Sequence, residues 1–293
     1  MISVIMAHYR REELLYKTLW GYVHVHTPEE LKDVEFVIVD DDGGRSKTLD
    51  KVVKLHRRRL KITTASMDEG THNPSGPMNF GLRLAVGDLF VLTNPENIPA
   101  TPHLLTKLKA YMDGHPNRYL SGACYSMDER DSSKFDLDID SREKFMKSLK
   151  SVELKSRKFG NNGSHSGWRQ HTKYFPGRLY FLAAMWKEPL FKMRGFDEDY
   201  MMGQSRDDVD LVWRARRMKM EFLATNELAV LHQFHFGPGC HKLKADRREK
   251  VSINFATFNR KKNLRSPVRN LDREWGQPKS GKWVDRWGED GKS

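Results

Sequence analysis

Two apolar segments in the N-terminal third of this sequence end abruptly in polar residues, and this pattern restricts the fold more than any other. Residues 34–39 form a β-branched run that stops at the carboxylates of Asp40 and Asp41. Residues 89–92 form a second run, which is followed by polar residues that include Asn94. Open α/β sheets bind ligands at the carboxyl ends of their parallel strands. We therefore expect polar groups at one edge of such a sheet, although the first cluster is equally typical of a solvated turn.

Amphipathic segments separate the expected strands. Residues 14–22 repeat apolar side chains at the spacing of one helix face, and residues 104–112 do the same. Shorter apolar segments at 2–6 and 61–64 are expected to add strands to the sheet. Strands that alternate with helices in this way predict an α/β fold, with a mostly parallel central sheet and helices on both of its faces.

Composition limits the class of protein. The 293 residues are enough for one large domain, and 51 Lys and Arg against 39 Asp and Glu give a net charge of +12. No apolar run reaches the roughly eighteen residues of a membrane-spanning helix, and no signal-peptide pattern begins the sequence. Cys124 and Cys240 are too few for a disulfide framework, which favours a reducing compartment. We expect a soluble, cytoplasmic location.

Three carboxylates, those of Asp207, Asp208 and Asp210, crowd the start of an expected helix. Like charges at this spacing repel each other. One explanation is structural, because acidic residues in a first helical turn bind free backbone N–H groups and suit the helix dipole. The other is that the carboxylates line a pocket in which one acts as a general base.

Two further patterns have both a structural and a functional interpretation. His232 and His235 follow an apolar segment at 228–231, where a single histidine is usually structural but a pair can bind a metal. A Gly-Phe-Asp-Glu sequence at 195–198 is typical of a turn with a buried phenylalanine. The other histidines, such as His8, are expected to be structural or exposed.

Several short motifs, in order along the chain, resemble those of family 2 glycosyltransferases with the Rossmann-like GT-A fold. Residues 3–11 resemble the family's strand that ends in Pro-Thr-Tyr-Asn-Arg, and Val39-Asp40-Asp41 resembles its pair of strand-end aspartates. The remaining motifs are Pro77-Met78-Asn79-Phe80-Gly81 with Ala85-Val86-Gly87-Asp88, Gly195-Phe196-Asp197-Glu198, and Asp207-Asp208-Val209-Asp210-Leu211. The resemblance covers residues 2–235 and implies the GT-A fold, followed by a basic C-terminal extension.

Two positions depart from the family pattern. The metal-binding Asp-x-Asp falls on Asn94-Pro95-Glu96, so an amide replaces one carboxylate. The resemblance still implies a divalent cation, Mn²⁺ or Mg²⁺, on Glu96 with His232 or His235. The arginine that often contacts the diphosphate is replaced by Met78, so basic side chains elsewhere would have to supply that contact.

The resemblance implies an inverting glycosyltransferase that uses a nucleotide sugar, with a UDP-sugar as the family default. The acceptor hydroxyl must lose its proton as it attacks, and we assign this role to Asp208, with Asp207 as the alternative. The residues expected to bind the nucleotide sugar are Ala7, Tyr9, Arg10, Asp40, Asp41, Asn79, Asn94 and Glu96. Those expected to line the sugar and acceptor pocket are Met185, Trp186, Asp197, Glu198 and Asp210.

The domain organisation follows from the motifs and the charge. Residues 1–240 are expected to form the GT-A domain, with 1–115 as the nucleotide-sugar half and 116–240 as the acceptor half. A basic loop at 141–175 is expected to be an acceptor-side lid. Residues 241–293 are expected to form a basic helical extension that contains tryptophans.

The acceptor is the least determined part of the reaction. Basic residues interleaved with Trp275, Trp283 and Trp287 suit a polyanion with stackable bases, although they equally suit a solvated tail. One hypothesis is therefore a hydroxymethylated base in DNA, flipped into the pocket. The same transferase could instead act on a saccharide or a cell-surface glycan. Asn94 and Met78 also suggest a catalytically silent nucleotide- or nucleic-acid-binding module.

Overall fold

The computed structural model describes residues 1–42, 46–67, 73–138, 141–154, 167–235, 244–278 and 283–287. Its strands are β1 (Ile2–His8), β2 (Val34–Asp40), β3 (Lys61–Ser66), β4 (Leu89–Thr93), β5 (Asn97–Pro99), β6 (Arg118–Ser126), β7 (Gly167–Gln170), β8 (Leu182–Trp186), β9 (Glu221–His232) and β10 (Trp283–Asp285). Its helices are α1 (Glu12–Val25), α2 (Lys47–His56), α3 (Ser75–Leu84), α4 (Leu104–Met112), α5 (Glu129–Asp138), α6 (Arg142–Leu154), α7 (Lys187–Lys192), α8 (Asp207–Arg217), α9 (Lys244–Lys261) and the 3₁₀ helix η1 (Glu198–Met202).

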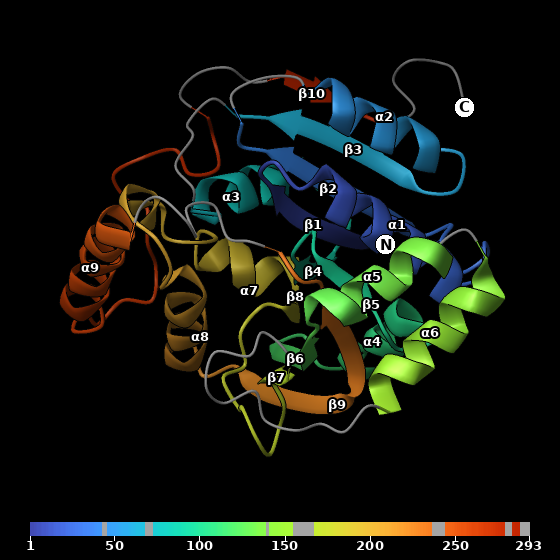
Figure 1. Ribbon diagram of the computed structural model, residues 1–293. Coiled ribbons are helices and arrows are strands. Elements are labelled where there is room, and N and C mark those ends of the chain that lie inside the picture. Colours follow the sequence, from blue (N-terminus) through green and yellow to red (C-terminus); the bar gives the residue numbers. More distant parts are fainter. Residues whose placement is uncertain are drawn as a thin grey trace.

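One twisted sheet runs through the molecule in the order β10-β3-β2-β1-β4-β8-β6-β9-β5, with β7 paired to β6 (Figure 1). The pairs β3–β2, β2–β1, β1–β4 and β6–β9 are parallel, and the other pairs are antiparallel. Helices cover both faces, which confirms the predicted α/β class and GT-A-like architecture.

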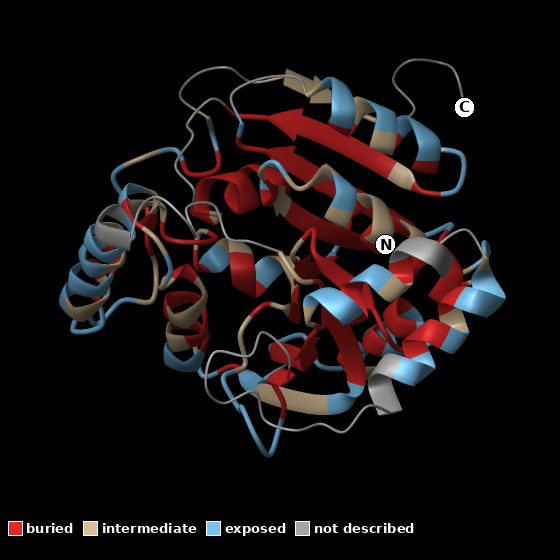
Figure 2. Ribbon diagram, in the orientation of Figure 1, coloured by how far each residue is buried: buried red, intermediate tan, exposed pale blue. Residues whose placement is uncertain are grey.

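The first strands are continuous apolar segments because the sheet is covered on both faces. Every residue of β2 and β4 is buried, and Figure 2 shows these strands in red, the colour of buried residues. Alternate side chains enter different cores: Val4 and Phe36 belong to the core beneath α1, whereas Ile5 and Val37 belong to the core beneath α3. In these segments the β-branched and aromatic side chains both favour the strand conformation and fill the two cores.

The expected loop at 141–175 is only partly irregular. Residues 142–154 form α6, which packs its buried Phe145 against Phe135 of α5, and residues 167–170 form β7. The apolar residues of this region are spaced for a helix face, and their signal was obscured by the many lysines around them. The glycine-rich centre of the expected lid, at 155–166, lies outside the described residues.

The C-terminal extension returns to the main sheet. Strand β10 pairs antiparallel with β3, and Asp285 forms an ion pair with Arg57 at 2.9 Å. Trp275 is buried against Phe191 in the core beneath α3. In the described part of the chain, no helix is both long and apolar enough to cross a membrane.

Candidate active site

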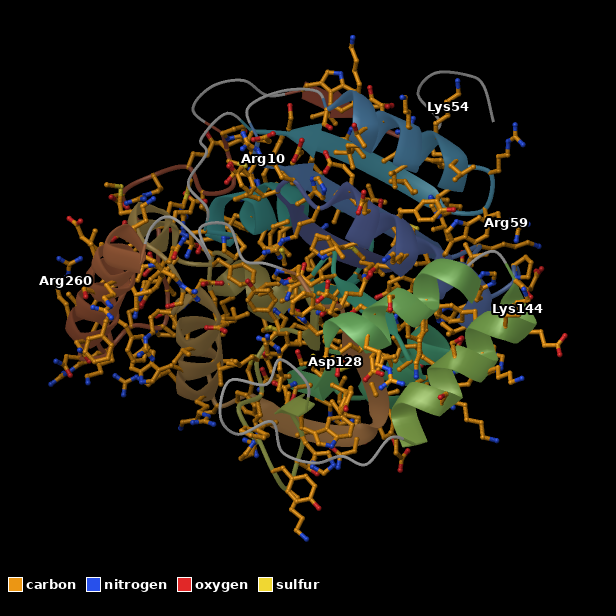
Figure 3. All side chains as sticks on the ribbon, in the orientation of Figure 1. Arg10, Lys54, Arg59, Asp128, Lys144 and Arg260 are labelled. Atoms are coloured by element: carbon orange, nitrogen blue, oxygen red, sulfur yellow. The ribbon has the colours of Figure 1, made fainter. Side chains whose placement is uncertain are left out.

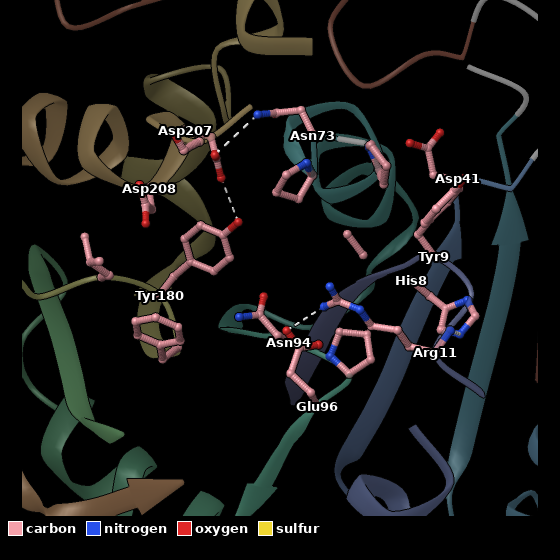
Figure 4. A pocket seen from close by; sticks show the side chains of 17 residues that line it. His8, Tyr9, Arg11, Asp41, Asn73, Asn94, Glu96, Tyr180, Asp207 and Asp208 are labelled. Carbon is pink, nitrogen blue, oxygen red and sulfur yellow. Dashed lines mark hydrogen bonds and ion pairs between the residues drawn. The ribbon is translucent and has the colours of Figure 1, made fainter. Parts of the chain in front are cut away.

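The carboxyl ends of the strands border a cavity of about 400 Å³ (Figure 4). Because β1, β2 and β4 are parallel, the segments that follow them meet at this edge. The lining residues are Ala7, His8, Tyr9 and Arg11 after β1, Asp41 after β2, Asn73, Pro74 and Pro77 around the start of α3, Asn94, Pro95 and Glu96 after β4, Leu179, Tyr180 and Phe181 before β8, and Ser205, Asp207 and Asp208 at the start of α8.

Glu96 lies in the turn between β4 and β5, where two histidines approach it. The pairing of Asn97 in β5 with His232 in β9 fixes this approach. The Nε2 atoms of His232 and His235 lie 3.5 Å and 3.7 Å from Oε1 of Glu96. Arg11 also contacts this oxygen, with its Nη1 atom 2.7 Å away.

This cluster has the donor atoms of a divalent metal site. One ligand atom from each of Glu96, His232 and His235 can be chosen so that all lie within 4.8 Å of one another. Oε2 of Glu96 and both ring nitrogens of His235 are buried without a hydrogen-bond partner among the described residues. Such atoms are costly to bury unless a ligand or an ion completes them. The residues therefore fit a divalent cation, and the Glu96 carboxylate is a ligand type that suits Mn²⁺ or Mg²⁺.

The protonation states in the cluster favour a cation. Burial alone would raise the pKa of Glu96, but Arg11 and the two imidazoles outweigh it and hold this pKa well below the usual range. Burial lowers the pKa of His232, although Glu96 opposes that shift. Glu96 is thus ionised and His232 neutral near pH 7, which are the forms that bind metals.

Asp207 and Asp208 begin α8 on another wall of the cavity. The left-handed backbone of Arg206, with φ of 74°, turns the chain into this helix. The Tyr180 hydroxyl donates to Asp207 at 2.7 Å, and Asn73 donates to the same carboxylate at 3.4 Å. Asp208 is less buried and accepts from its neighbouring backbone N–H of Val209 at 2.7 Å.

Burial shifts both carboxylates toward the base strength needed near neutral pH. Burial and the neighbouring Asp208 raise the pKa of Asp207 to about 7, against the hydrogen bonds from Tyr180 and Asn73. Burial also raises the pKa of Asp208, and Val209 N–H and Arg206 limit the shift. Asp207 holds two side-chain hydrogen bonds, so Asp208 is the carboxylate better placed to accept a proton from a ligand.

The structure brings together Ala7, Tyr9, Asp41, Asn94, Glu96, Asp207 and Asp208 around the cavity, with the two histidines beside Glu96. Asp40 is not among them. It is buried and bonded to Nδ1 of His8 at 2.8 Å, and its neighbour Asp41 lines the cavity. Successive residues of an extended strand point to opposite sides, so only one of the pair can face a ligand. His8, expected to be merely structural, both lines the cavity and holds Asp40.

Arg10 and Asn79 also lie outside the cavity lining. Arg10 is exposed and pairs with Asp42 at 2.7 Å. Asn79 is fully buried and exchanges hydrogen bonds with the backbone of Phe196, at 2.9 Å and 2.6 Å. Asn79 therefore joins α3 to the Gly-Phe-Asp-Glu segment, and its role in the structure is to hold the fold together.

The expected acceptor carboxylates form internal contacts instead. Asp197 is buried and paired with Lys261 at 2.6 Å, and Asp210 is paired with Arg214 at 2.6 Å. Glu198 accepts from Asn79 and from the backbone N–H of Gly276, at 2.8 Å and 2.7 Å. These carboxylates satisfy buried donors, as the structural interpretation of the turn and of the helix start requires.

Met185 and Trp186 lie at the opposite end of the sheet. Trp186 pairs with Leu89, the first residue of β4, and its indole donates to the His115 carbonyl at 3.1 Å. Met185 is fully buried in the core. Strand β8 runs antiparallel to β4, so its beginning, near Tyr180, approaches the cavity and its end points away.

Arg11, Asn73 and Tyr180 line the cavity and were not predicted. Arg11 aligns with the final arginine of the family's first motif, which was the signal available for it. Tyr180 stood in an apolar run that gave no sign that its hydroxyl contacts Asp207. Asn73 lies next to the undescribed residues 68–72, in a segment without periodicity.

Comparisons with known proteins identify the family of this chain. The model of the family "Glycosyl transferase family 2" matches residues 3–172, more than half of the chain. The chain therefore belongs to glycosyl transferase family 2.

Similar curated sequences cover a smaller region. Validoxylamine A glucosyltransferase from Streptomyces hygroscopicus subsp. limoneus is 29% identical over 130 residues, which span 44% of this chain and 28% of that protein. The protein of the same name from subsp. jinggangensis (strain 5008) is also 29% identical, over 30% of its length. The alignment thus spans less than a third of either relative.

Solved structures share the fold over most of the chain. The mannosyltransferase PcManGT from Pyrobaculum calidifontis, in complex with GDP-Man and Mn²⁺, superposes with a TM-score of 0.56 at 16% identity, covering 88% of this chain and 64% of that one. S. aureus TarS 1–349 in complex with UDP-GlcNAc gives 0.57 at 15% identity, covering 87% and 65%. At this identity the likeness concerns the fold alone.

Proposed function

We propose that the protein is an inverting glycosyltransferase that moves a sugar from a nucleotide sugar to an acceptor hydroxyl. One observation carries this proposal: a cavity at the carboxyl edge of the sheet has Glu96 with its two histidines on one wall and Asp208 on another. The nucleoside diphosphate leaves from the Glu96 side, where positive charge is available. Asp208 accepts the proton of the attacking hydroxyl on the other side, so a single displacement inverts the anomeric carbon.

The residues that would hold the donor follow from the cavity lining. Tyr9 and Asp41 stand near the ends of β1 and β2, where the family places the nucleoside. Glu96, His232 and His235 would hold a divalent cation, which when bound neutralises charge on the leaving diphosphate. For the donor we propose a UDP-sugar or a GDP-sugar, because two similar solved structures contain ligands of these classes.

For the acceptor we propose a polyanion, with a hydroxymethylated base in DNA as the first candidate and a glycan as the alternative. The net charge of +12 supports this proposal. So does the position of α9, whose Phe255 packs under the Arg206 guanidinium at 4.9 Å, directly before Asp207. Cations on or beside α9 that are not paired with Asp197 include Arg206, Arg247, Arg248, Lys250, Arg260 and Lys262.

Replacing the proposed base tests the reaction. Asp208→Asn keeps the size of the side chain but removes its proton affinity, so we expect transfer to fall by about 10² to 10⁴-fold. The measurement is mass spectrometry of acceptors after incubation with a panel of nucleotide sugars, with and without Mn²⁺. The matched control is Asp113→Asn, at an exposed carboxylate paired with Lys109 away from the cavity.

Two results would contradict the proposal. Wild-type turnover by Asp208→Asn would exclude Asp208 as the base. A wild-type protein that binds nucleotide sugars but neither transfers nor hydrolyses them would support the catalytically silent module, which the substitution at Asn94 also suggests.

A further inference from the structure

Arg11 already occupies the position of a cation beside Glu96. Its Nη1 atom lies 2.7 Å from Oε1 of Glu96, the same oxygen that the imidazoles of His232 and His235 approach at 3.5 Å and 3.7 Å. Figure 4 shows the Arg11 side chain reaching across the floor of the cavity toward Glu96. The guanidinium and an incoming metal ion would therefore compete for one carboxylate.

The charge balance makes this competition strong. Among the described residues of the cluster, Glu96 supplies the one carboxylate, because position 94 carries a neutral amide. The single negative charge is already balanced by Arg11, so a divalent cation entering alone would meet uncompensated repulsion.

Arg11 is also able to leave Glu96 for an anion in the cavity. Its side chain is 24% exposed, against 5% for Glu96, and it lines the cavity. Within the described part of the chain, Glu96 is the acceptor found for the guanidinium, so its other N–H groups remain for a ligand. Arginine matches the geometry of phosphate oxygens. Met78, which stands where relatives often carry a phosphate-binding arginine, is fully buried in the core.

We propose that Arg11 is an internal counter-cation of Glu96, which a nucleoside diphosphate draws away so that a divalent cation can bind. The diphosphate supplies the negative charge that the metal lacks, and the metal replaces Arg11 on Glu96. Each ligand therefore tightens the other by the same factor. This inference rests on the proposed use of a nucleotide donor, and it concerns binding, so it can be tested without turnover.

The test is a Mn²⁺ titration followed by the EPR signal of free Mn²⁺, for the wild type and Arg11→Gln, with and without UDP or GDP. Complexes of Mn²⁺ with nucleotide alone are measured in the same buffer and subtracted. We expect the wild type to bind Mn²⁺ weakly until a nucleotide is added. Arg11→Gln should bind Mn²⁺ alone at least about tenfold more tightly, with a smaller gain from the nucleotide.

Two further variants make the result specific. Arg58→Gln removes an exposed arginine that does not line the cavity, so it should behave as the wild type. Arg11→Lys retains the charge and should keep the weak Mn²⁺ binding, which also covers the case in which Arg11→Gln fails to fold.

The inference would be overturned if Arg11→Gln bound Mn²⁺ with the affinity of the wild type. It would also be overturned if Arg11→Lys bound Mn²⁺ as tightly as we expect for Arg11→Gln. So would the absence of Mn²⁺ binding in every form with nucleotide present. Sugar transfer is measured on the same samples: transfer without Mn²⁺ binding would overturn this inference and leave the proposed function intact. Nucleotide-dependent Mn²⁺ binding without transfer would support Arg11 and count against the transferase.

Discussion

At the scale of single residues, adjacent aspartates in α8 have different surroundings. Asp207 is nearly fully buried and held by Tyr180 and Asn73, whereas Asp208 faces the cavity with more of its surface free. Two adjacent buried carboxylates cannot both ionise easily, so a proton is retained near neutral pH. Burial and the charge of Asp208 make Asp207 the carboxylate that keeps it, against the opposing effect of the hydrogen bonds from Tyr180 and Asn73.

This assignment predicts how stability depends on pH. The pKa of Asp207 is about 7 in the folded protein and about 4 in an unfolded chain, so between these values the folded state holds a proton that the unfolded state releases. The free energy of unfolding should therefore fall as the pH rises through this window, by up to about 1.4 kcal/mol per pH unit. Asp207→Asn should remove most of this fall, as measured by urea denaturation at several pH values.

Asp113→Asn is the control, because its exposed carboxylate has no such neighbour and should leave the pH dependence unchanged. Parallel stability curves for the wild type and Asp207→Asn would show that Asp207 titrates normally and that the pair does not share a proton.

At the scale of elements, α9 is attached to the molecule by polar contacts. The Asn254 amide donates to the carbonyls of Tyr200 and Ser205 at 2.9 Å and 2.8 Å, and Lys261 joins Asp197 and Asp199 at 2.6 Å each. These contacts hold α9 against η1 and the segment that leads into α8. The C-terminal extension thereby supports the wall that carries Asp208.

Asn254→Ala tests this support. The substitution leaves the buried carbonyl of Tyr200 and the partly buried carbonyl of Ser205 without this donor, and we expect a loss of about 1 to 3 kcal/mol in the free energy of unfolding. Ser252→Ala, at an exposed position of the same helix, should change it by about 0.5 kcal/mol or less. The measurement is thermal and urea denaturation of both variants. Equal effects would mean that α9 contributes nothing specific through Asn254.

At the scale of the whole molecule, the positive charge is spread over several surfaces. Figure 3 shows Arg260 on α9 at one side, and Lys54, Arg59 and Lys144 at the opposite side. A general excess of basic residues favours solubility and non-specific binding of polyanions. Specific docking near the cavity instead requires that the cations of α9 contribute more than those of α2.

Salt dependence separates these two cases. We expect duplex DNA that contains hydroxymethylcytosine to bind with an affinity that falls steeply between about 50 and about 200 mM salt. Replacing Arg247, Arg248 and Arg260 by Gln should reduce the slope of log K against log salt by about 0.9 for each lost phosphate contact. The measurement is fluorescence anisotropy of labelled DNA.

The matched control replaces Lys51 and Lys54 of α2 and Arg58 just after it, which are equally exposed. An equal loss in both triple variants, or weak binding that is indifferent to salt, would contradict docking through α9 and favour a glycan acceptor.

Two of the buried strands were predicted correctly from local sequence. The apolar runs at 34–39 and 89–92 are strands because their hydrophobicity suits a sheet buried on both faces, and Asp41 and Asn94 after them line the cavity. Glu96 with His232 and His235 was also predicted as a cluster. Such features depend on short-range pattern and on strand direction, which the amino-acid sequence encodes directly.

The tertiary structure alone decided which polar residues face the cavity and which bind other parts of the protein. Asp197 and Asp210 have the same chemistry as Asp208, yet Lys261 and Arg214 neutralise them because those partners fold against them. Asp40 bonds to His8 inside the protein, and Asp41 lines the cavity in its stead. Arg11 lies beside Glu96 because β1 and β4 are neighbouring strands. The partner of a charged group depends on contacts between distant segments, and sequence pattern does not record them.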